Sequence, residues 1–175
     1  MRAAHEQDYV DYVNARLPSL RRLAHHLCRD PHRADDVVQT AMTRLYVNWG
    51  RARQAADLNR YVDAIVVRCF LNDQRLGWWS RVRLAGAVPE PPAAHGPDVE
   101  TRSVVRAALA QVPPRQRAVL VLRFLHDLPV AEVAEILGCS AGNVKSQSAR
   151  GLATLRKLLG ETAAGFEGLV RDGCR

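Results

Sequence analysis

The sequence has few aromatic residues, few cysteines and no long uninterrupted apolar run. Only 6% of its 175 residues are aromatic although 47% are hydrophobic, a composition that favours helical packing built on Leu, Val and Ala. No segment approaches the roughly 18 consecutive apolar residues of a membrane-spanning helix, and the N-terminal stretch lacks the apolar core of a signal peptide. We therefore expect a cytoplasmic protein with no membrane partner.

The four cysteines are scattered and form no C-x-x-C pair: Cys28, Cys69, Cys139 and Cys174. This spacing predicts neither a disulfide framework nor a zinc ribbon. Three histidines lie close in sequence to the first cysteine and could in principle hold a metal with it: His25, His26 and His32. A helix break expected before His32 leaves its side chain free to point elsewhere, so we expect packing and surface roles here and no bound metal.

Signatures of catalysis are absent as well. The sequence contains no phosphate-binding glycine loop, no nucleophile elbow and no H-E-x-x-H pair. Asp35 and Asp36 are adjacent and diverge on a helix, which makes them a poor acid/base pair. We therefore expect neither an enzyme nor a cofactor. The net charge of +7 instead favours a polyanionic partner.

The segment 129–157 predicts two helices joined by a tight turn. Gly138 suits the turn, and Ser140 suits the N-cap of the second helix. Ala134 supplies a small residue where two helix axes cross, and Val144 supplies an aliphatic residue that faces back toward the first helix. Together these features predict a helix-turn-helix.

The second helix of this pair carries charge of one sign. Its basic residues are Lys145, Arg150, Arg156 and Lys157, and no acid occurs between Glu135 and Glu161. Small polar side chains that can hydrogen-bond base edges accompany them: Asn143, Ser146, Gln147 and Ser148. A scaffolding helix pair with a solvated basic face is the alternative, but the combination favours nucleic-acid binding.

The first half of the chain predicts three helices. The first runs from about Glu6 to Cys28 and is expected to kink or split at Pro18. The second runs from Pro31 to about Trp49, with Asp30 as its N-cap. Its apolar face is expected in the core: Ala34, Val37, Val38, Ala41, Met42, Leu45 and Trp49.

The opposite face of this second helix carries a compact polar strip: Asp36, Gln39, Thr40 and Thr43, with Asp35 beside it. From the residues alone, the strip is either a solvated face or a binding surface. Its acids are favourably placed near the N-terminus of the helix in either case.

A loop is predicted over residues 50–57, followed by a third helix from about Leu58 to Trp79 with Asp57 as its N-cap. The apolar stripe of this helix is Leu58, Val62, Ile65, Val66, Cys69 and Leu76. A second basic surface lies on another face of it: Arg60, Arg68, Asn72 and Arg75. Two basic surfaces in separate units suggest two contacts on one extended nucleic acid.

Residues 84–98 read as a proline-rich linker, because four prolines cannot occupy a helix interior and favour extended backbone. After it, Pro113 and Pro114 are expected to open a helix of sequence RQRAVLVLRFL. Its core residues are expected to be Val119, Leu120, Leu122 and Phe124, and its surface residues Arg115, Arg117 and Arg123. The tail, residues 161–175, has weak periodicity and is expected to be frayed or loosely docked.

These elements predict an all-α fold of two small helical domains joined by a proline-rich linker, the second a helix-turn-helix domain. The expected domains are residues 1–83 and 99–160. No strand signal of consequence occurs.

Three segments, in order, resemble the extracytoplasmic-function sigma factors, which direct bacterial RNA polymerase to promoters. They are RADDVVQTAMTRLYVNW (33–49), VPPRQRAVLVLRF (112–124) and the helix-turn-helix VAEVAEILGCSAGNVKSQSARGLATLR (130–156). The run NVKSQSARGLATLR is especially similar to the SigE-type subgroup. The resemblance covers about Tyr9 to Leu159, nearly the whole chain.

The resemblance implies roles for the surfaces of the first domain. The polar strip would bind the β′ clamp helices of core polymerase through Asp36, Gln39 and Thr40, and more loosely through Asp35 and Thr43. The loop that precedes the third helix would capture a flipped base of the −10 element through Gln54, Asp57 and Asn59. Adjoining phosphates and the upstream edge of the bubble would be held by Arg60, Arg68, Asn72 and Arg75.

In the second domain, the resemblance implies major-groove contacts with the −35 element through Lys145, Ser146, Ala149 and Arg150. Asn143 and Ser140 would touch phosphate at the N-terminus of that helix. Contact with the polymerase β flap is a weaker implication for Phe124, Leu125 and Leu128, for which core packing is favoured.

The implied function is that of an alternative sigma factor, which binds core polymerase and directs promoter-specific initiation. An anti-sigma factor is a possible further partner. The other reading is a stand-alone helix-turn-helix regulator that binds an operator as a dimer, although the sequence shows no dimerisation helix and no evident ligand pocket.

Overall fold

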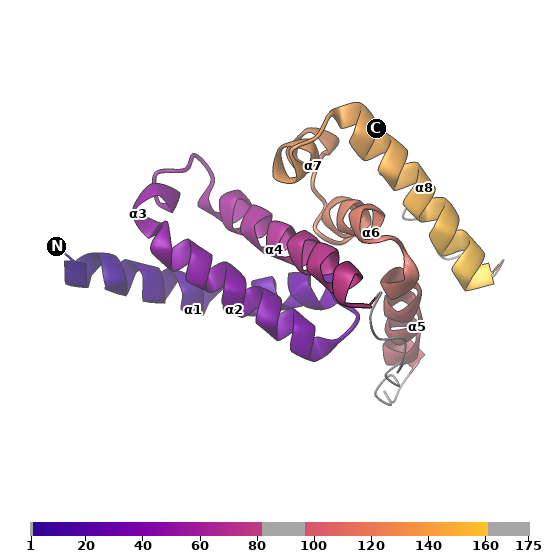
Figure 1. The fold of residues 1–175 in the computed structure, drawn as a ribbon, viewed down its shortest axis with the longest axis horizontal. Helices are drawn as coiled ribbons and strands as arrows, with labels where there is room; N and C mark the ends of the chain where they lie inside the picture. Colours follow the sequence, from indigo (N-terminus) through magenta and orange to yellow (C-terminus); the bar gives the residue numbers. More distant parts are fainter. Residues whose placement is uncertain (1, 82–96, 161–175) are drawn as a thin grey trace. The chain divides into compact units, whose positions relative to one another are not determined.

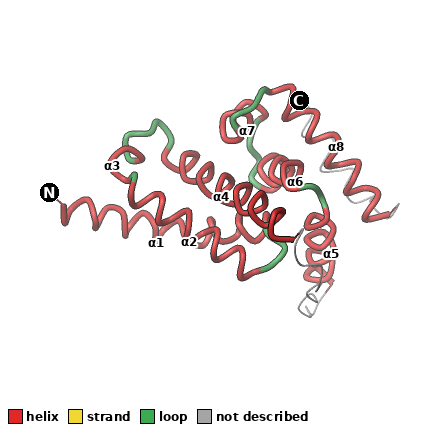
Figure 2. Tube along the Cα trace, viewed as in Figure 1, coloured by secondary structure: helices red, strands yellow, loops and turns green. Residues whose placement is uncertain are grey.

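A computed structural model describes residues 2–81 and 97–160, with side chains for 5–74 and 104–160. The chain divides into two compact units, Met1–Ala85 and Gly86–Arg175. All regular structure in the described ranges is helical (Figure 2), which confirms the predicted all-α fold. The predicted tail and all but the last two residues of the predicted linker lie outside the described residues.

The first unit consists of α1 (Arg2–Leu27), α2 (Pro31–Val47), the short α3 (Trp49–Ala52) and α4 (Leu58–Arg81). Helices α1, α2 and α4 pack against one another (Figure 1). The first helix continues unbroken through Pro18, so the chain does not split there. The second ends at Val47, and α3 occupies the start of the predicted loop.

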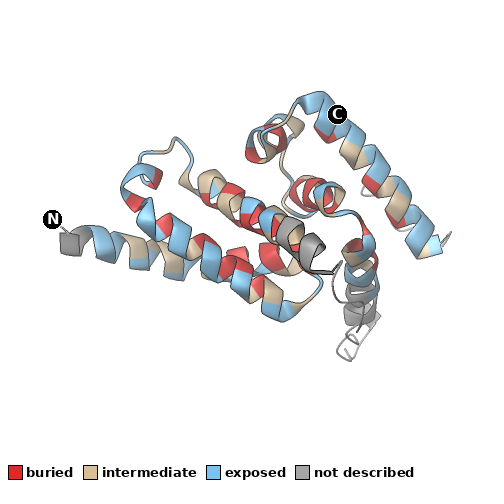
Figure 3. Cartoon of the chain, viewed as in Figure 1, coloured by how far each residue is buried: buried red, intermediate tan, exposed pale blue. Residues whose placement is uncertain are grey.

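The core of this unit is formed by one face of each long helix (Figure 3). Its fully buried side chains include Leu20, Leu23, Leu27, Leu45, Val62, Val66, Val67 and Phe70. Burial of each large aliphatic or aromatic side chain contributes about 1.5–3 kcal/mol. The prediction for α4 identified Val62, Val66 and Cys69 correctly but missed Val67 and Phe70, which widen the buried stripe.

Both predicted N-caps of the first unit are confirmed. Oδ1 of Asp30 accepts a hydrogen bond from the backbone N of His32 at 3.0 Å, and Pro31 follows as the first residue of α2. Oδ1 of Asp57 accepts a hydrogen bond from the backbone N of Arg60 at 2.9 Å. Each aspartate thus satisfies a backbone donor that has no partner within its own helix.

An aromatic cluster fixes α3 against α1. The ring of Tyr9 makes edge contacts with Tyr46 at 5.1 Å and with Trp49 at 5.5 Å between centroids. The hydroxyl of Tyr9 donates to the backbone O of Met42 at 3.0 Å, and Tyr12 lies 5.5 Å from Trp49 between centroids. Burial raises the pKa of Tyr9 and Tyr12, so both hydroxyls stay protonated and can donate.

A partly buried ion pair joins α1 to α4. Nη2 of Arg16 lies 3.0 Å from Oδ1 of Asp63, whose side chain is 15% exposed. Burial raises the pKa of Asp63 to about 6, and the lowering effect of Arg16 only partly offsets it. The carboxylate is therefore costly to keep charged even with its partner.

The second unit consists of α5 (Pro97–Gln111), α6 (Pro114–Leu120), the π-helix η1 (Val121–Leu125), α7 (Val130–Leu137) and α8 (Ala141–Leu159). Helix α8 packs against α5, α6 and α7. Gly151 allows α8 to lie close to α6, because a Cβ there would lie 3.0 Å from Cδ1 of Leu120 and 3.3 Å from Cβ of Gln116.

The helix predicted after Pro114 does not stay α-helical. From Val121 it widens into η1, and the backbone N of His126 donates to the O of Val121 at 3.0 Å. Asp127 follows with a positive φ of 51°, an uncommon conformation for a residue with a side chain. The π-helical turn thereby changes the direction in which Phe124 and Leu125 leave the backbone.

Arg117 was expected at the surface and is instead 3% exposed. Its Nη2 donates to the backbone O of Ala110 at 2.6 Å and to that of Val112 at 3.0 Å. These carbonyls lie at the end of α5 and just beyond it, where backbone acceptors lack partners within the helix. The side chain therefore joins α6 to the end of α5.

Replacing Asp63 by Asn should change how the stability of the first unit depends on pH. Because the folded pKa of Asp63 is raised to about 6 from 3.8, its contribution is fully present below pH 4 and lost as pH rises through 6. The free energy of unfolding of the wild type, relative to Asp63→Asn, should thus increase on acidification, by roughly 1.4 kcal/mol for each pKa unit. Tryptophan fluorescence during denaturation reports on this unit, since all three tryptophans lie in it. A difference that is independent of pH between 4 and 7 would contradict the raised pKa.

Replacing Arg117 by Leu should destabilise the second unit by about 3 kcal/mol, because buried carbonyls lose a charged donor. Arg115→Leu is the matched control, since Arg115 is exposed and two residues away on the same helix. Amide hydrogen exchange of α8 measures the effect in the intact chain. Equal exchange rates in the two variants would show that the Arg117 hydrogen bonds contribute little.

Candidate nucleic-acid and protein interfaces

Helices α7 and α8 form the predicted helix-turn-helix. Gly138 ends α7 in the left-handed conformation, with φ of 62°. Oγ of Ser140 accepts a hydrogen bond from the backbone N of Asn143 at 3.2 Å and caps α8. Ala134 and Val144 are buried. All four residues therefore occupy the positions that their spacing predicted.

One face of α8 is left exposed. Val144, Gly151 and Leu155 are buried. The exposed residues include all six that were predicted to contact DNA: Ser140, Asn143, Lys145, Ser146, Ala149 and Arg150. Lys145 and Ala149 are four residues apart, as are Ser146 and Arg150, so these pairs form two neighbouring rows. The surface combines positive charge with hydroxyl donors and contains no acid between its ends.

The polar strip on α2 is exposed as well. Asp36, Gln39, Thr40 and Thr43 all lie on the solvent side of the helix. Oγ1 of Thr43 donates to the backbone O of Gln39 at 2.9 Å. Asp35 is half-buried, and its Oδ1 lies 3.7 Å from Nε of Arg21 on α1. The strip is therefore continuous, but Asp35 already has a partner within the chain.

Two of the three candidates for base capture also support the fold. Asp57 uses one carboxylate oxygen to cap α4, and its other oxygen lies 3.8 Å from Nε of Arg60. Oδ1 of Asn59 accepts a hydrogen bond from the hydroxyl of Tyr12 at 3.0 Å. Gln54, which follows α3, is exposed. The loop is thus held at its α4 end by contacts of Asp57 and Asn59.

The basic face of α4 is present over the part whose side chains are described. Arg68 and Asn72 are exposed, and Arg60 is half-buried. These residues are eight and four positions apart and so lie on one side of the helix. The side chain of Arg75 lies outside the described residues.

Two arginines next to the loop were not singled out from the sequence. Arg51 on α3 is exposed, and Nη1 of Arg53 lies 3.6 Å from Oδ2 of Asp8 on α1. They extend the positive charge of the first unit to the loop that precedes α4. The signal available in the sequence is the spacing of the two arginines in GRARQ, within a segment that predicts a loop.

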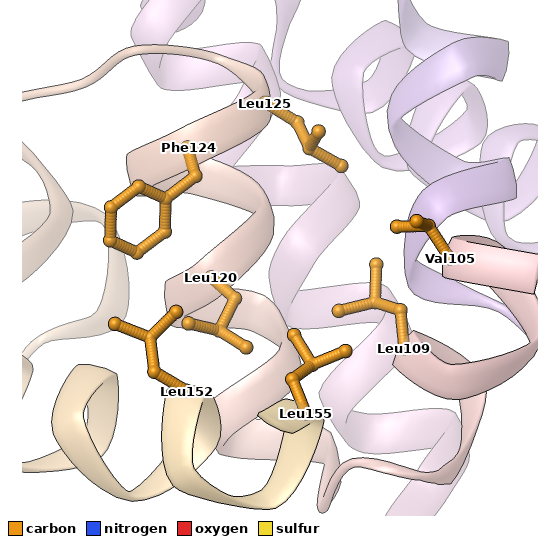
Figure 4. A pocket seen from close by; sticks show the side chains of 7 residues that line it. All are labelled: Val105, Leu109, Leu120, Phe124, Leu125, Leu152 and Leu155. Atoms are coloured by element: carbon orange, nitrogen blue, oxygen red, sulfur yellow. The ribbon is translucent and has the colours of Figure 1, made fainter. Parts of the chain in front are cut away.

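An apolar groove opens on the second unit between α5, the turn of η1 and α8 (Figure 4). Its lining residues are Val105, Leu109, Leu120, Phe124, Leu125, Leu152 and Leu155. Leu125 is 48% exposed and Phe124 is half-buried. The expected core packing is therefore wrong for Leu125, because the π-helical turn presents it to the groove. Leu128 is half-buried, and its backbone O accepts from Nη1 of Arg123 at 2.8 Å.

Within the described side chains, no group of three or more His, Cys, Asp or Glu residues could hold a metal ion. None of the helices described here is both long and apolar enough to cross a membrane.

Comparison with known proteins identifies two sigma-factor segments, one in each unit. Residues 12–80 match the family described as sigma-70 region 2. Residues 102–155 match sigma-70 region 4. The first match contains the polar strip and the basic face of α4. The second contains most of the helix-turn-helix and all seven residues that line the apolar groove.

Relatives match over most of the chain. An RNA polymerase sigma-E factor of Streptomyces coelicolor is 37% identical over 158 residues, which cover 87% of this chain and 86% of the relative. The ECF RNA polymerase sigma factor SigM of Mycobacterium tuberculosis is 34% identical, covering 81% and 71%.

A solved structure of similar fold is the sigma factor RpoE of Bartonella quintana, in complex with the anti-sigma factor NepR. It has a TM-score of 0.71 and 23% identity, with 87% of this chain and 97% of that chain covered. This similarity of fold agrees with the two sequence relatives, whose matches to this chain span 86% and 71% of their own lengths. The chain therefore belongs to the extracytoplasmic-function sigma factors of bacterial RNA polymerase.

Proposed function

We propose that this sigma factor divides promoter-specific initiation among three surfaces: the exposed face of α8, the polar strip of α2, and the α3–α4 loop with the basic face of α4. The observation that carries the proposal is the exposed face of α8, where every predicted DNA contact lies outside the buried stripe. In this assignment residues 99–160 recognise the −35 element, and residues 1–83 bind core polymerase and the −10 element.

The −35 element is assigned to α8 because its charge and its N-cap suit a helix that enters the major groove. Lys145 and Arg150 supply charge, and Ser146 supplies a hydroxyl that can pair with a base edge or phosphate. Ala149 is small, which leaves more of the readout to Arg150 and to the shape of the DNA.

The −10 element is assigned to the loop before α4 and to the basic face of that helix. Gln54 is exposed and carries both a donor and an acceptor, as reading the edge of a flipped base requires. Arg60, Arg68, Asn72 and Arg75 are assigned to the adjoining backbone, for which a row of donors along one helix is suited.

Core polymerase is assigned to the polar strip of α2, whose partner would be the β′ clamp helices. Asp36 provides negative charge and Gln39 and Thr40 provide hydrogen-bonding groups, which suits a basic helical partner. In the second unit, the exposed Leu125 with Phe124 and Leu128 is the candidate contact for the β flap. This role needs no catalytic group in the chain, because the chemistry of RNA synthesis belongs to the polymerase, and it implies a cytoplasmic location.

Nothing supports the alternative of a stand-alone regulator, since relatives that span most of the chain are named as polymerase sigma factors. An anti-sigma factor is a candidate partner, because a sigma factor of similar fold was solved with one.

Run-off transcription with purified core polymerase tests the proposal, using promoters found by mapping transcript starts after overexpression. Arg150→Ala should lower transcription about tenfold, because one base contact is worth roughly 1–3 kcal/mol. Arg156→Ala is the control, since Arg156 is exposed but lies near the other end of α8. The loss of transcription caused by Arg150→Ala should be smaller on a promoter whose −35 element is replaced by an unrelated sequence. Absence of any promoter-specific transcript from the wild type would sink the proposed function.

Replacing Asp36 and Gln39 together by Ala should weaken binding to core polymerase about tenfold, or roughly 1.4 kcal/mol. Gln7→Ala with Asp11→Ala is the matched control, since it removes the same two residue types from an exposed, hydrogen-bonded pair on α1. Competition with a fluorescent sigma factor for core enzyme measures both. Equal loss of binding in the two double variants, or loss of helicity in the first, would contradict the assignment.

A further inference from the structure

Helix α3 presents Arg51 on the side that faces away from α1. Trp49 and Ala52 are the buried residues of this short helix. The ring of Trp49 lies 5.5 Å, between centroids, from the rings of Tyr9 and Tyr12 on α1. Arg51 follows Trp49 by two residues, or about 200° around the helix axis. Its side chain therefore leaves α3 opposite the buried contact, from a backbone that the aromatic cluster holds in place.

The helical backbone continues beyond α3 and brings Arg51 beside Gln54. The backbone N of Gln54 donates to the O of Arg51 at 3.1 Å. Residues three apart in such a turn lie on the same side, with about 5–6 Å between their Cβ atoms. Both side chains are exposed, so they form one small polar surface where the loop from α3 to α4 begins (Figure 1).

Three arginines lie near this loop, and two of them already face an acid. Nη1 of Arg53 lies 3.6 Å from Oδ2 of Asp8, and Nε of Arg60 lies 3.8 Å from Oδ2 of Asp57. Among the side chains that the structure describes, no acid forms an ion pair with Arg51. Its guanidinium is therefore available to a phosphate, which it can bind through two parallel hydrogen bonds.

We propose that Arg51 binds the backbone phosphate beside the base that Gln54 reads, on the non-template strand of the −10 element. A base that leaves the stack stays attached to its backbone, so its capture at Gln54 brings the flanking phosphates to the surface that both residues share. Arg51 then supplies affinity and fixes the position of the strand, whereas Gln54 discriminates among bases. This assignment rests on the proposed capture of a −10 base at the loop.

Holoenzyme assembled from core polymerase and the full chain tests the contact on a fluorescent single-stranded −10 oligonucleotide. Arg51→Ala should weaken binding severalfold at low salt. It should also make the slope of log K against log salt concentration shallower by about 0.7, because one phosphate contact with a single strand is lost. Arg53→Ala is the matched control, since it makes the same change in net charge two residues away but removes an arginine that faces Asp8. Equal changes of slope in the two variants would overturn the proposal, because they would reveal a general effect of charge.

Neutral methylphosphonate linkages, placed one at a time along the oligonucleotide, locate the phosphate. The linkage beside the captured base should weaken binding to wild-type holoenzyme but have no further effect in Arg51→Ala, since the contact is already lost there. In Arg53→Ala the same linkage should act as it does in the wild type. If Arg51→Ala leaves the effect of every linkage unchanged, Arg51 binds no phosphate of this strand.

Exchanging the bases of the oligonucleotide separates this inference from the proposed function. The captured base is the position at which Gln54→Ala removes a base preference of the wild type. A coupled phosphate beside that base supports the proposal, and a coupled phosphate remote from it overturns the placement of Arg51. A coupled phosphate without any base preference would disprove base capture but still show that Arg51 contacts the strand. Weaker binding of Arg51→Ala to core polymerase, with an unchanged salt slope, would instead assign Arg51 to the polymerase.

Discussion

A helix packed against its neighbours can give only one face to the core, and both units depend on this constraint. In α2 the buried face contains Ala34 and Ala41, whose small side chains let the neighbouring helices approach closely. In α8 the buried positions include Gly151, where even one added carbon would contact Leu120 at 3.0 Å. The opposite faces take no part in packing and can carry side chains chosen for binding. The candidate interfaces are these remaining faces, held rigid by the cores behind them.

Features that depend on a few consecutive residues could be predicted from the sequence. An N-cap needs only a short polar side chain before a helical repeat, and Asp30, Asp57 and Ser140 all cap as predicted. The turn at Gly138 needs a residue that tolerates positive φ, and it is glycine. The exposed faces of α2 and α8 could also be predicted from the helical repeat of apolar residues alone, because the buried stripe of a helix determines which side stays exposed to solvent.

Features that depend on residues far apart in the sequence could not be predicted in this way. Arg16 and Asp63 are 47 positions apart, and neither sequence neighbourhood indicates the other. Arg117 follows an ordinary helical pattern, and its burial depends on the carbonyls that α5 leaves at its end. The run VLRFL fits an α-helix and a π-helix equally well by composition. Leu125 is exposed, and the groove is open beside it, because this run forms a π-helix.

The fold also limits what the candidate base-capture residues can do. Oδ1 of Asp57 is used by the N-cap of α4, and Oδ1 of Asn59 accepts from Tyr12. Because the amide oxygen has two lone pairs and the amide nitrogen carries two hydrogens, Asn59 keeps one acceptor position and both donors after this hydrogen bond. Asn59 and Gln54 could therefore each donate to or accept from a base edge, although Asn59 has less acceptor capacity left. The hydrogen bonds at the start of α4 thus reduce, without removing, the acceptor capacity of Asp57 and Asn59.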